Sequence, residues 1–296
     1  MRPSRTCSRR QNLMPNPNLA AEIKHIALKR GASACGLVRA EAAAEYARFK
    51  TAAARVPPGL SYLNRSPSPR ADIRNWFAPA KTVLVCAFRY WSGASDYAAV
   101  LDKAGEPSAY LRHTGRKPHP EFIAGVKALG LRPKISRYAL SPDYHEVLRE
   151  KLGLMLADIK AAHGGTEGKA FADTSPVLEK ELGRLAGLGF RGKNTLLISE
   201  EFGSYFFIGG LALSLELRPE GLSVPAAAQT GCGECGKCAA ACPTGALNVQ
   251  GVLDPGLCLS YWTTQSKTPA PEEIVRSSEG YIYGCDICQT ACPYNR

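Results

Sequence analysis

Cysteine spacing near the end of the chain is the feature that most constrains what this sequence can fold into. Eight of the 11 cysteines in the 296 residues lie between positions 232 and 292. The first motif, CGECGKCAAACP, is a C-x2-C-x2-C-x3-C-P run, and the second, CDICQTACP, repeats its last three cysteines and its proline. In proteins with two [4Fe–4S] clusters, the fourth cysteine of such a run ligates the other cluster. The first motif therefore predicts a second set of ligands.

Counting thiols gives two complete sets of four once Cys258 is added to the two motifs. We expect one cluster on Cys232, Cys235, Cys238 and Cys292, and the other on Cys242, Cys258, Cys285 and Cys288. Structural zinc and a disulfide scaffold are the alternatives, but zinc sites favour two C-x2-C pairs a dozen or more residues apart. Clusters change oxidation state one electron at a time, so this segment predicts an electron-transfer module that serves another part of the chain.

The remaining composition is typical of a globular protein with two domains. The longest apolar run, around residues 205–217, is too short to cross a bilayer, so we expect no membrane association. Ser8-Arg9-Arg10 is similar to a twin-arginine export signal, but no apolar segment follows it. We expect a basic tail over residues 1–17, with Met14 as an alternative start, and a cytoplasmic location in which cysteines serve as ligands rather than disulfides. Cys7, Cys35 and Cys86 stand alone and are interpreted as structural.

Residues 18–225 alternate helical and strand-like patterns, which predicts an α/β domain. We expect helices over 18–31 and 141–165 and strands over 81–90, 194–199 and 203–217. The pattern of residues 92–120 predicts a long loop or an insertion, and that of residues 219–230 predicts a linker between domains.

The stretch GLGFRG at 187–192 matches the G-x-G-x-x-G pattern of dinucleotide-binding turns. Such a turn needs a strand before it and a helix after it, whereas the patterns here predict the reverse order. We therefore expect these glycines to let the backbone approach a bulky ligand, with Lys193 and Asn194 beside it.

Five stretches and the cysteine motifs, in this order along the chain, closely resemble the epoxyqueuosine reductase family. They are SRYALSPDYH (136–145), FADTSPVLEKELGRLAGLGFRGKNTLLI (171–198), FGSYFFIGGL (202–211), CLSYWT (258–263) and YGCDICQTACPYN (283–295). The resemblance implies an α/β (α+β) fold, with a nitroreductase-like cobalamin-binding catalytic domain over 18–225 and a ferredoxin-like domain with two [4Fe–4S] clusters over 226–296. It also implies reduction of epoxyqueuosine to queuosine at tRNA position 34, with cobalamin held base-off.

Partners follow from the same resemblance: tRNA as substrate, an external electron donor such as a flavodoxin or ferredoxin system, and a monomeric enzyme. Residues 226–296 contain four Lys or Arg and six Asp or Glu, so with a total charge of +11 the first 225 residues carry +13. A basic catalytic domain suits a polyanion such as tRNA, although a solvated basic surface is the alternative.

Removal of an epoxide oxygen takes two electrons and protons, and ring opening calls for an acid. The resemblance assigns this acid to Asp173 of the D-x-x-P-V-L-E motif, and burial would raise its pKa. The alternative is that Asp173 caps a helix that begins near Pro176. The resemblance further implies a cobalamin site lined by Arg65, Ser136, Asn194, Leu197, Ile208 and Ser260. For Tyr138, Tyr144 and His145, the sequence leaves open whether they belong to the site or serve in packing.

Two departures from the family are visible. SPDYH replaces a glycine-containing loop, which we expect to change only a turn. The family commonly continues past C-P-x-N into a helical-repeat tail that helps hold tRNA, whereas this sequence ends at Arg296. Three alternatives stay open: the basic domain suffices to hold tRNA, a separate chain helps, or the sequence is a shortened form. A reductive dehalogenase, which would share cobalamin and both clusters, and an electron-transfer ferredoxin are the alternative functions.

Overall fold

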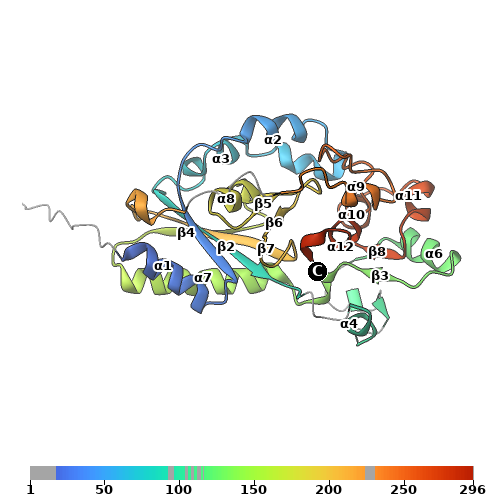
Figure 1. Ribbon diagram of the computed structural model, residues 1–296, viewed down its shortest axis with the longest axis horizontal. Helices are drawn as coiled ribbons and strands as arrows, with labels where there is room; N and C mark the ends of the chain where they lie inside the picture. The colour runs from blue at the N-terminus through green and yellow to red at the C-terminus, as the bar shows by residue number, and fades with distance from the viewer. Residues whose placement is uncertain are drawn as a thin grey trace, which may run out of the picture.

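A four-stranded antiparallel sheet organises one half of the molecule, and the cysteine motifs organise the other (Figure 1). The structure, a computed structural model, describes residues 18–92, 97–103, 106–107, 110–111, 115, 117–223 and 231–295. The expected tail over 1–17, with Cys7 and Met14, lies outside these residues. The expected mixed class is confirmed, with every neighbouring pair in the central sheet antiparallel.

The central sheet has the strand order β1-β2-β7-β4. Its strands are β1 (Ala34–Arg39), β2 (Thr82–Arg89), β7 (Phe206–Leu213) and β4 (Gly168–Ala172). β2 and β7 pair along eight consecutive positions, from Thr82 opposite Leu213 to Arg89 opposite Phe206. Seven of the eight residues of β2 are buried, because helices cover both faces of the sheet. The strands expected over 81–90 and within 203–217 are therefore confirmed.

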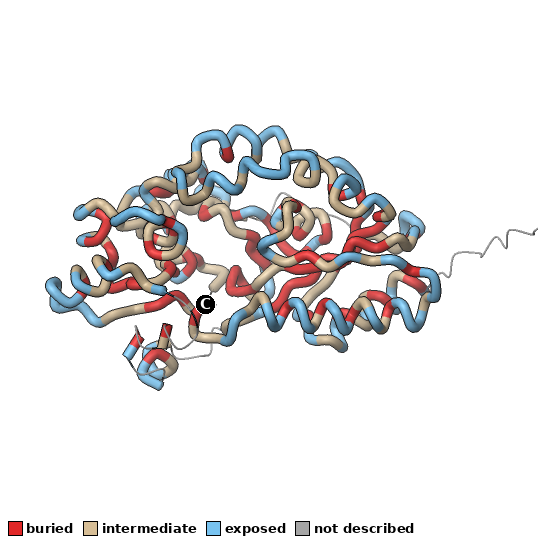
Figure 2. Tube along the Cα trace, turned by 180° about the vertical axis from the view of Figure 1, so that it is seen from behind, coloured by how far each residue is buried: buried red, intermediate tan, exposed pale blue. Residues whose placement is uncertain are grey.

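Helices α1 (Leu19–Lys29) and α7 (Tyr144–Ala162) cover one face, and α8 (Glu179–Leu185) covers the other (Figure 1). α7 buries Leu148, Leu152, Met155 and Ile159, which recur every three or four residues and form one apolar stripe. Figure 2 shows the same layering, with buried strands between helices whose outer sides are exposed. Helices α2 (Tyr46–Ala53) and α3 (Pro67–Ala71) lie beyond α8. We call this half the sheet lobe.

A second hydrophobic core lies in the other half, which we call the cysteine lobe. Its elements are α4 (Tyr97–Lys103), α6 (Pro120–Ala128), β3 (Lys134–Ile135), α9 (Lys237–Ala240), α10 (Leu259–Thr264), α11 (Glu272–Arg276), β8 (Tyr281–Tyr283) and α12 (Ile287–Thr290). β3 pairs with β8 in parallel, so residues near 135 and 282 share one core. The expectation of a long loop over 92–120 is wrong where the chain is described, because it contains α4 and buries Leu101 and Leu111.

The two cores do not follow the boundary expected near residue 225, because Leu101, Phe122 and Ile135 pack in one core with Leu259 and Ile282. The strand expected over 194–199 shortens to β6 (Leu197–Ile198), which pairs with β5 (Phe190–Arg191). Helix α8 precedes GLGFRG and the hairpin of β5 and β6 begins within it, so the reversed order that excludes a dinucleotide turn is confirmed. None of the helices in the described ranges is both long and apolar enough to cross a bilayer.

Candidate functional site

Eight cysteines surround two cavities in the cysteine lobe, four thiols to each. Cys232, Cys235, Cys238 and Cys292 line a cavity of about 60 Å³. Cys242, Cys258, Cys285 and Cys288 line a second cavity of about 290 Å³. All eight thiols are free, and their grouping in space matches the two sets expected from counting.

Short helices at equivalent places in the two motifs position these cysteines. α9 carries Cys238 and α12 carries Cys288, and the two helices pack against each other. The segment of residues 192–194 in the sheet lobe contacts the first cysteine set. The backbone N–H of Lys193 donates to Cys232 Sγ at 3.3 Å. Lys193 Nζ also donates to the carbonyl oxygen of Cys235 at 3.0 Å. The residues that were expected to lie beside a ligand thus touch the first cysteine set.

Burial raises the pKa of five of these thiols, those of Cys238, Cys258, Cys285, Cys288 and Cys292. It raises the pKa of Cys288 to about 12, with nearby Cys258 adding to the effect. Cys242 differs: burial alone would raise its pKa, but hydrogen bonds from Thr244 and from the backbone of Leu247 and Ala246 hold it below the ordinary value. Four buried thiolates repel one another, so this arrangement suits positively charged ions between them.

No group of three or more His, Cys, Asp or Glu side chains in the described ranges converges so as to hold a single metal ion. A [4Fe–4S] cluster makes a different demand, because each iron takes one cysteine thiolate and the four sulfurs stand around the cluster. The two four-cysteine cavities fit that demand.

Asp173 directly follows β4 and faces the first turn of α7. Its backbone is left-handed, with φ of 49°. The Tyr144 hydroxyl donates to Asp173 Oδ2 at 2.7 Å, and His145 Nε2 lies 2.9 Å from the same oxygen. Burial, reinforced by the nearby Asp173, raises the pKa of Tyr144, so its hydroxyl stays a donor. α8 begins at Glu179 with Leu178 as its cap, so the alternative that Asp173 caps this helix is wrong.

The chain by itself does not bury Asp173, whose side chain is 55% exposed. Asp143 caps α7 and also lies 2.8 Å from His145 Nδ1, so the imidazole bridges two carboxyl groups. The Tyr144 ring stacks on Phe207 of β7, with centroids 4.1 Å apart. Tyr144 and His145, left open by the sequence, therefore pack at the start of a helix and also hold Asp173.

The second cavity brings together some of the residues expected around cobalamin and leaves others out. Ser136, Asn194, Ser260 and Tyr138 line it together with the four cysteines. Leu197 and Ile208 lie in the apolar layer under α8, and Arg65 is exposed beyond the 3-10 helix Pro58–Asn64. Asp173 lies outside the lining, and no described histidine lines either cavity.

Asn194 and Lys180 are two polar residues of the sheet lobe that line the second cavity. Asn194 lines both cavities, is nearly buried, and has no partner for its Nδ2. Lys180 lines the second cavity and donates to the carbonyl oxygen of Thr195 at 3.1 Å. We did not expect a role for Lys180, although its place directly after the D-x-x-P-V-L-E motif was a signal.

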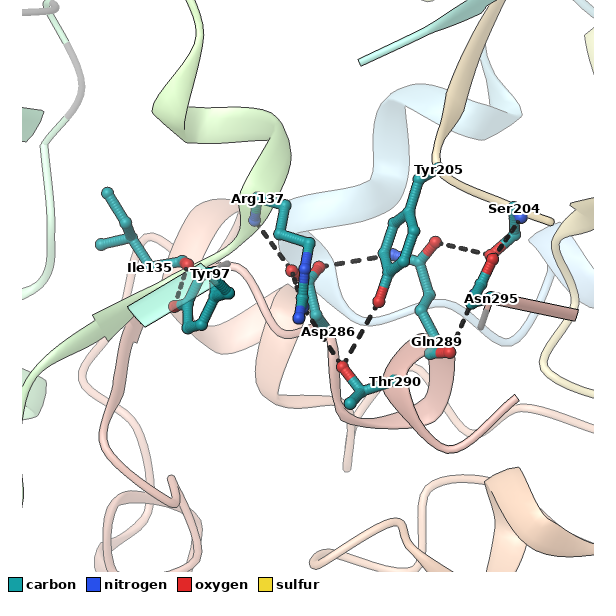
Figure 3. Close-up of polar contacts among 9 residues, drawn as sticks. All are labelled: Tyr97, Ile135, Arg137, Ser204, Tyr205, Asp286, Gln289, Thr290 and Asn295. Carbon is teal, nitrogen blue, oxygen red and sulfur yellow. Dashed lines mark hydrogen bonds and ion pairs between the residues drawn. The ribbon is translucent and has the colours of Figure 1, made fainter. Parts of the chain in front are cut away.

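A buried ion pair joins the second cysteine motif to residue 137 (Figure 3). Asp286, between Cys285 and Cys288, is 1% exposed and accepts from the backbone N–H of Arg137 at 2.8 Å. The Arg137 guanidinium lies 3.2 Å from the same carboxylate oxygen and faces the rings of Tyr97 and Tyr205. Burial raises the pKa of Asp286, and Arg137 opposes that rise.

A second set of polar contacts joins the chain end to the sheet lobe (Figure 3). Asn295 Oδ1 accepts from the backbone N–H of Ser204 at 2.6 Å, and Asn295 Nδ2 donates to the Gln289 carbonyl oxygen at 2.8 Å. The Ser204 hydroxyl donates to Gln289 Oε1 at 2.8 Å. A side chain at Gly203, where φ is 73°, would come within 2.0 Å of Asn295 Oδ1.

Comparisons with known proteins match both halves of the chain. The family described as "4Fe-4S double cluster binding domain" matches residues 231–295, and "Epoxyqueuosine reductase QueG, DUF1730" matches residues 70–174. Epoxyqueuosine reductases from Cyclobacterium marinum and Gloeobacter violaceus are 39% and 42% identical over 163 residues. Those alignments cover 55% of this chain and 51% and 50% of the relatives.

Solved structures extend the likeness to nearly the whole chain. An epoxyqueuosine reductase from Streptococcus thermophilus is 28% identical with a TM-score of 0.72, covering 94% of this chain and 66% of that one. An epoxyqueuosine reductase solved with an epoxyqueuosine-modified tRNA stem loop is 25% identical with a TM-score of 0.68, covering 94% and 65%. A reductive dehalogenase is 17% identical with a TM-score of 0.51 and covers 93% and 31%, which shows a shared fold.

Fold and site define a class of protein in which an α+β domain is joined to a C-terminal domain for two [4Fe–4S] clusters. Within that class, the proteins that this chain is similar to are the epoxyqueuosine reductases, the family whose motifs its sequence resembles. The matched region spans about half the length of the curated relatives.

Proposed function

We propose that this protein reduces epoxyqueuosine to queuosine in tRNA, with cobalamin and two [4Fe–4S] clusters as cofactors. The observation that carries the proposal is the second cavity, where four cysteines share one space with Ser136, Tyr138 and Ser260. An electron carrier held by the cysteines would there lie beside a cofactor held by the other walls. The relative solved with a modified tRNA stem loop supports the substrate.

The proposed cofactor sites follow the two cavities. Cys232, Cys235, Cys238 and Cys292 would hold one cluster, and Cys242, Cys258, Cys285 and Cys288 the other. Ser136, Asn194 and Ser260 would hold cobalamin beside the second cluster, while Arg65, Leu197 and Ile208 belong to this proposal by family resemblance. When bound, cobalamin supplies a strongly reducing metal centre, and the clusters supply it with single electrons.

Asp173 is the proposed general acid. Tyr144 and His145 fix its carboxyl group, leaving Oδ1 free to face a substrate that enters from the exposed side. As the epoxide C–O bond breaks, Asp173 gives its proton to the departing oxygen. Substrate and cofactor would cover Asp173 and supply the burial that the chain alone does not, which favours the protonated acid.

The proposed partners are tRNA and an external electron donor. The positive charge of the first 225 residues would attract tRNA, and an external flavodoxin or ferredoxin would supply electrons. We propose that the protein acts as a monomer in the cytoplasm.

The test is conversion of an epoxyqueuosine-containing anticodon stem loop, followed by mass spectrometry, with anaerobically reconstituted protein and a strong reductant. Asp173→Asn keeps the shape but removes the proton, so we expect conversion to fall by about 10²-fold or more while iron, sulfide and cobalamin contents stay unchanged. Asp158→Asn is the matched control, since Asp158 pairs with Arg30 on the outside of α7. Full activity of Asp173→Asn would disprove the acid assignment, and an inactive but fully loaded wild type would disprove the function.

A further inference from the structure

Glu179 places a second carboxyl group directly behind Asp173. It is the first residue of α8, and its carboxyl group accepts from the backbone N–H of Asp173. Its Oε1 atom is buried and has no hydrogen-bond partner. A buried carboxylate without partners is costly, whereas the neutral acid is tolerated.

Of the charged groups around Glu179, Asp173 favours the neutral acid, whereas the adjacent Lys180 has the opposite but smaller effect. Asp173 faces it from the preceding loop, and Tyr144 interacts with it from α7. Lys180, next to it on α8, directs its amine to the carbonyl oxygen of Thr195, and no described cation forms an ion pair with Glu179. Burial, with the charge of Asp173 as the second cause, raises the pKa of Glu179 to about 8.

The proposed reaction needs more protons than Asp173 holds. Conversion of an epoxide to an alkene breaks two C–O bonds and consumes two electrons and two protons, with water as the second product. A single aspartate delivers one proton and must then be recharged.

We propose that Glu179 is the second proton donor of the site and recharges Asp173 during each turnover, an inference that rests on the proposed function. Asp173 protonates the oxygen as the first C–O bond breaks, and Glu179 then transfers its proton to the Asp173 carboxylate. Asp173 delivers this proton to the hydroxide that leaves when the second C–O bond breaks, which yields water. The external donor provides both electrons through the clusters, and solvent restores the proton of Glu179. The Tyr144 hydroxyl donates to the Asp173 carboxyl group, and the charge of Glu179 is also felt at Tyr144.

Infrared spectroscopy of the cofactor-loaded protein without substrate tests whether Glu179 holds the proton. We expect a protonated-carboxyl band at pH 6 to 7 that disappears with a midpoint of about 8. The band should be absent from Glu179→Gln and retained by Glu181→Gln. Glu181 lies two residues along α8, is also largely buried, and accepts from the backbone of Glu45 instead. A band of unchanged intensity and midpoint in Glu179→Gln would overturn the inference, since any contribution from Asp286 or Glu181, whose pKa values burial also raises, is common to both proteins.

Single-turnover conversion against pH tests the transfer itself. Wild-type and Glu181→Gln rates should fall as pH rises through about 8, whereas Glu179→Gln should be roughly 10-fold or more slower at pH 7 and lack this decline. Glu179→Asp keeps an acid at the position and should restore part of the decline even if the glutamine variant folds poorly. An active wild type matched by Glu179→Gln at every pH would overturn the inference and leave the function intact. A fully loaded wild type without activity would overturn both.

Discussion

Asp286 shows how one residue between two proposed cluster ligands connects the halves of the molecule. Its carboxylate is buried and receives Arg137 through both the backbone and the guanidinium. Tyr97 of the cysteine lobe and Tyr205 of the sheet lobe place their rings against the same guanidinium. Burial of an ion pair costs desolvation energy, so its main effect is to specify one arrangement of these parts.

Arg137→Met should therefore destabilise the protein by about 3 kcal/mol or more, because it leaves Asp286 charged and buried without its partner. The double variant Arg137→Met with Asp286→Asn should lose less than Arg137→Met alone, since no uncompensated charge remains. Thermal unfolding of the cluster-loaded variants measures the order of their stabilities. A double variant that is less stable than Arg137→Met would contradict this account.

Glu179 predicts a pH dependence of stability. Its folded pKa of about 8 lies above the ordinary value of 4.5, so between these values the folded chain binds more protons than the unfolded chain. Stability should therefore decrease as pH rises from about 5 to 8, and Glu179→Gln should remove that contribution. The unfolding temperature of Glu179→Gln should therefore rise relative to that of the wild type as pH increases, and the difference should be largest near pH 8. A difference that is constant from pH 5 to 8 would contradict the prediction.

At the scale of elements, β7 carries two adjacent glycines in the middle of the sheet, Gly209 and Gly210, and their surroundings differ in tightness. A Cβ atom at Gly210 would lie 2.2 Å from the carbonyl oxygen of Leu84 in β2 and 2.5 Å from the Phe171 ring. At Gly209 the nearest atoms are 3.2 to 3.3 Å away. β7 can thus pair closely with both neighbours only because position 210 lacks a side chain.

Gly210→Ala should destabilise the protein by about 1–3 kcal/mol, the usual cost of overpacking a core. Gly209→Ala is the matched control and should cost less, because its added methyl group meets atoms that need to move only a few tenths of an ångström. Chemical denaturation of both variants tests the difference. Equal costs would show that the β2–β7 spacing adapts freely.

Long elements with strong patterns were predictable from the sequence, and short elements between distant segments were not. α7 and β2 carry a long apolar period or run, and each occurs where the pattern indicated. β3 has two residues and gains its pairing from β8, almost 150 positions later, so no local pattern marks it. The cysteine sets followed from ligand counting, whereas Asp286 reads in sequence as an ordinary surface acid and is in fact buried.

At the scale of the whole molecule, the two lobes meet along contacts made by the end of the chain. Asn295 bonds both to Ser204 of the sheet lobe and to Gln289 beside the cysteines (Figure 3). Lys193 of the sheet lobe also donates hydrogen bonds to Cys232 and Cys235 of the first cysteine set. The positions of the proposed clusters relative to Asp173 therefore depend in part on these contacts, together with those of Arg137 and Tyr205.

Asn295→Ala should loosen this junction by about 1–3 kcal/mol, because it leaves buried polar groups unpaired. We expect faster amide hydrogen exchange over residues 199–205 and little change in α1, which lies far from the junction. Asn248→Ala, which removes an amide from an exposed turn of the cysteine lobe, is the control. Unchanged exchange at Ser204 would show that Asn295 does not hold the lobes together.

The parallel pairing of β3 with β8 has a consequence for synthesis on the ribosome. The apolar side chains of α6 and β3 emerge early, but their partners in α10, α11 and β8 are translated more than 120 residues later. At about 5–20 residues per second, these side chains remain without their partners for at least several seconds after they are synthesised. The nascent chain should therefore depend on chaperones during this interval, and ribosomes stalled just before codon 259 should carry an aggregation-prone intermediate.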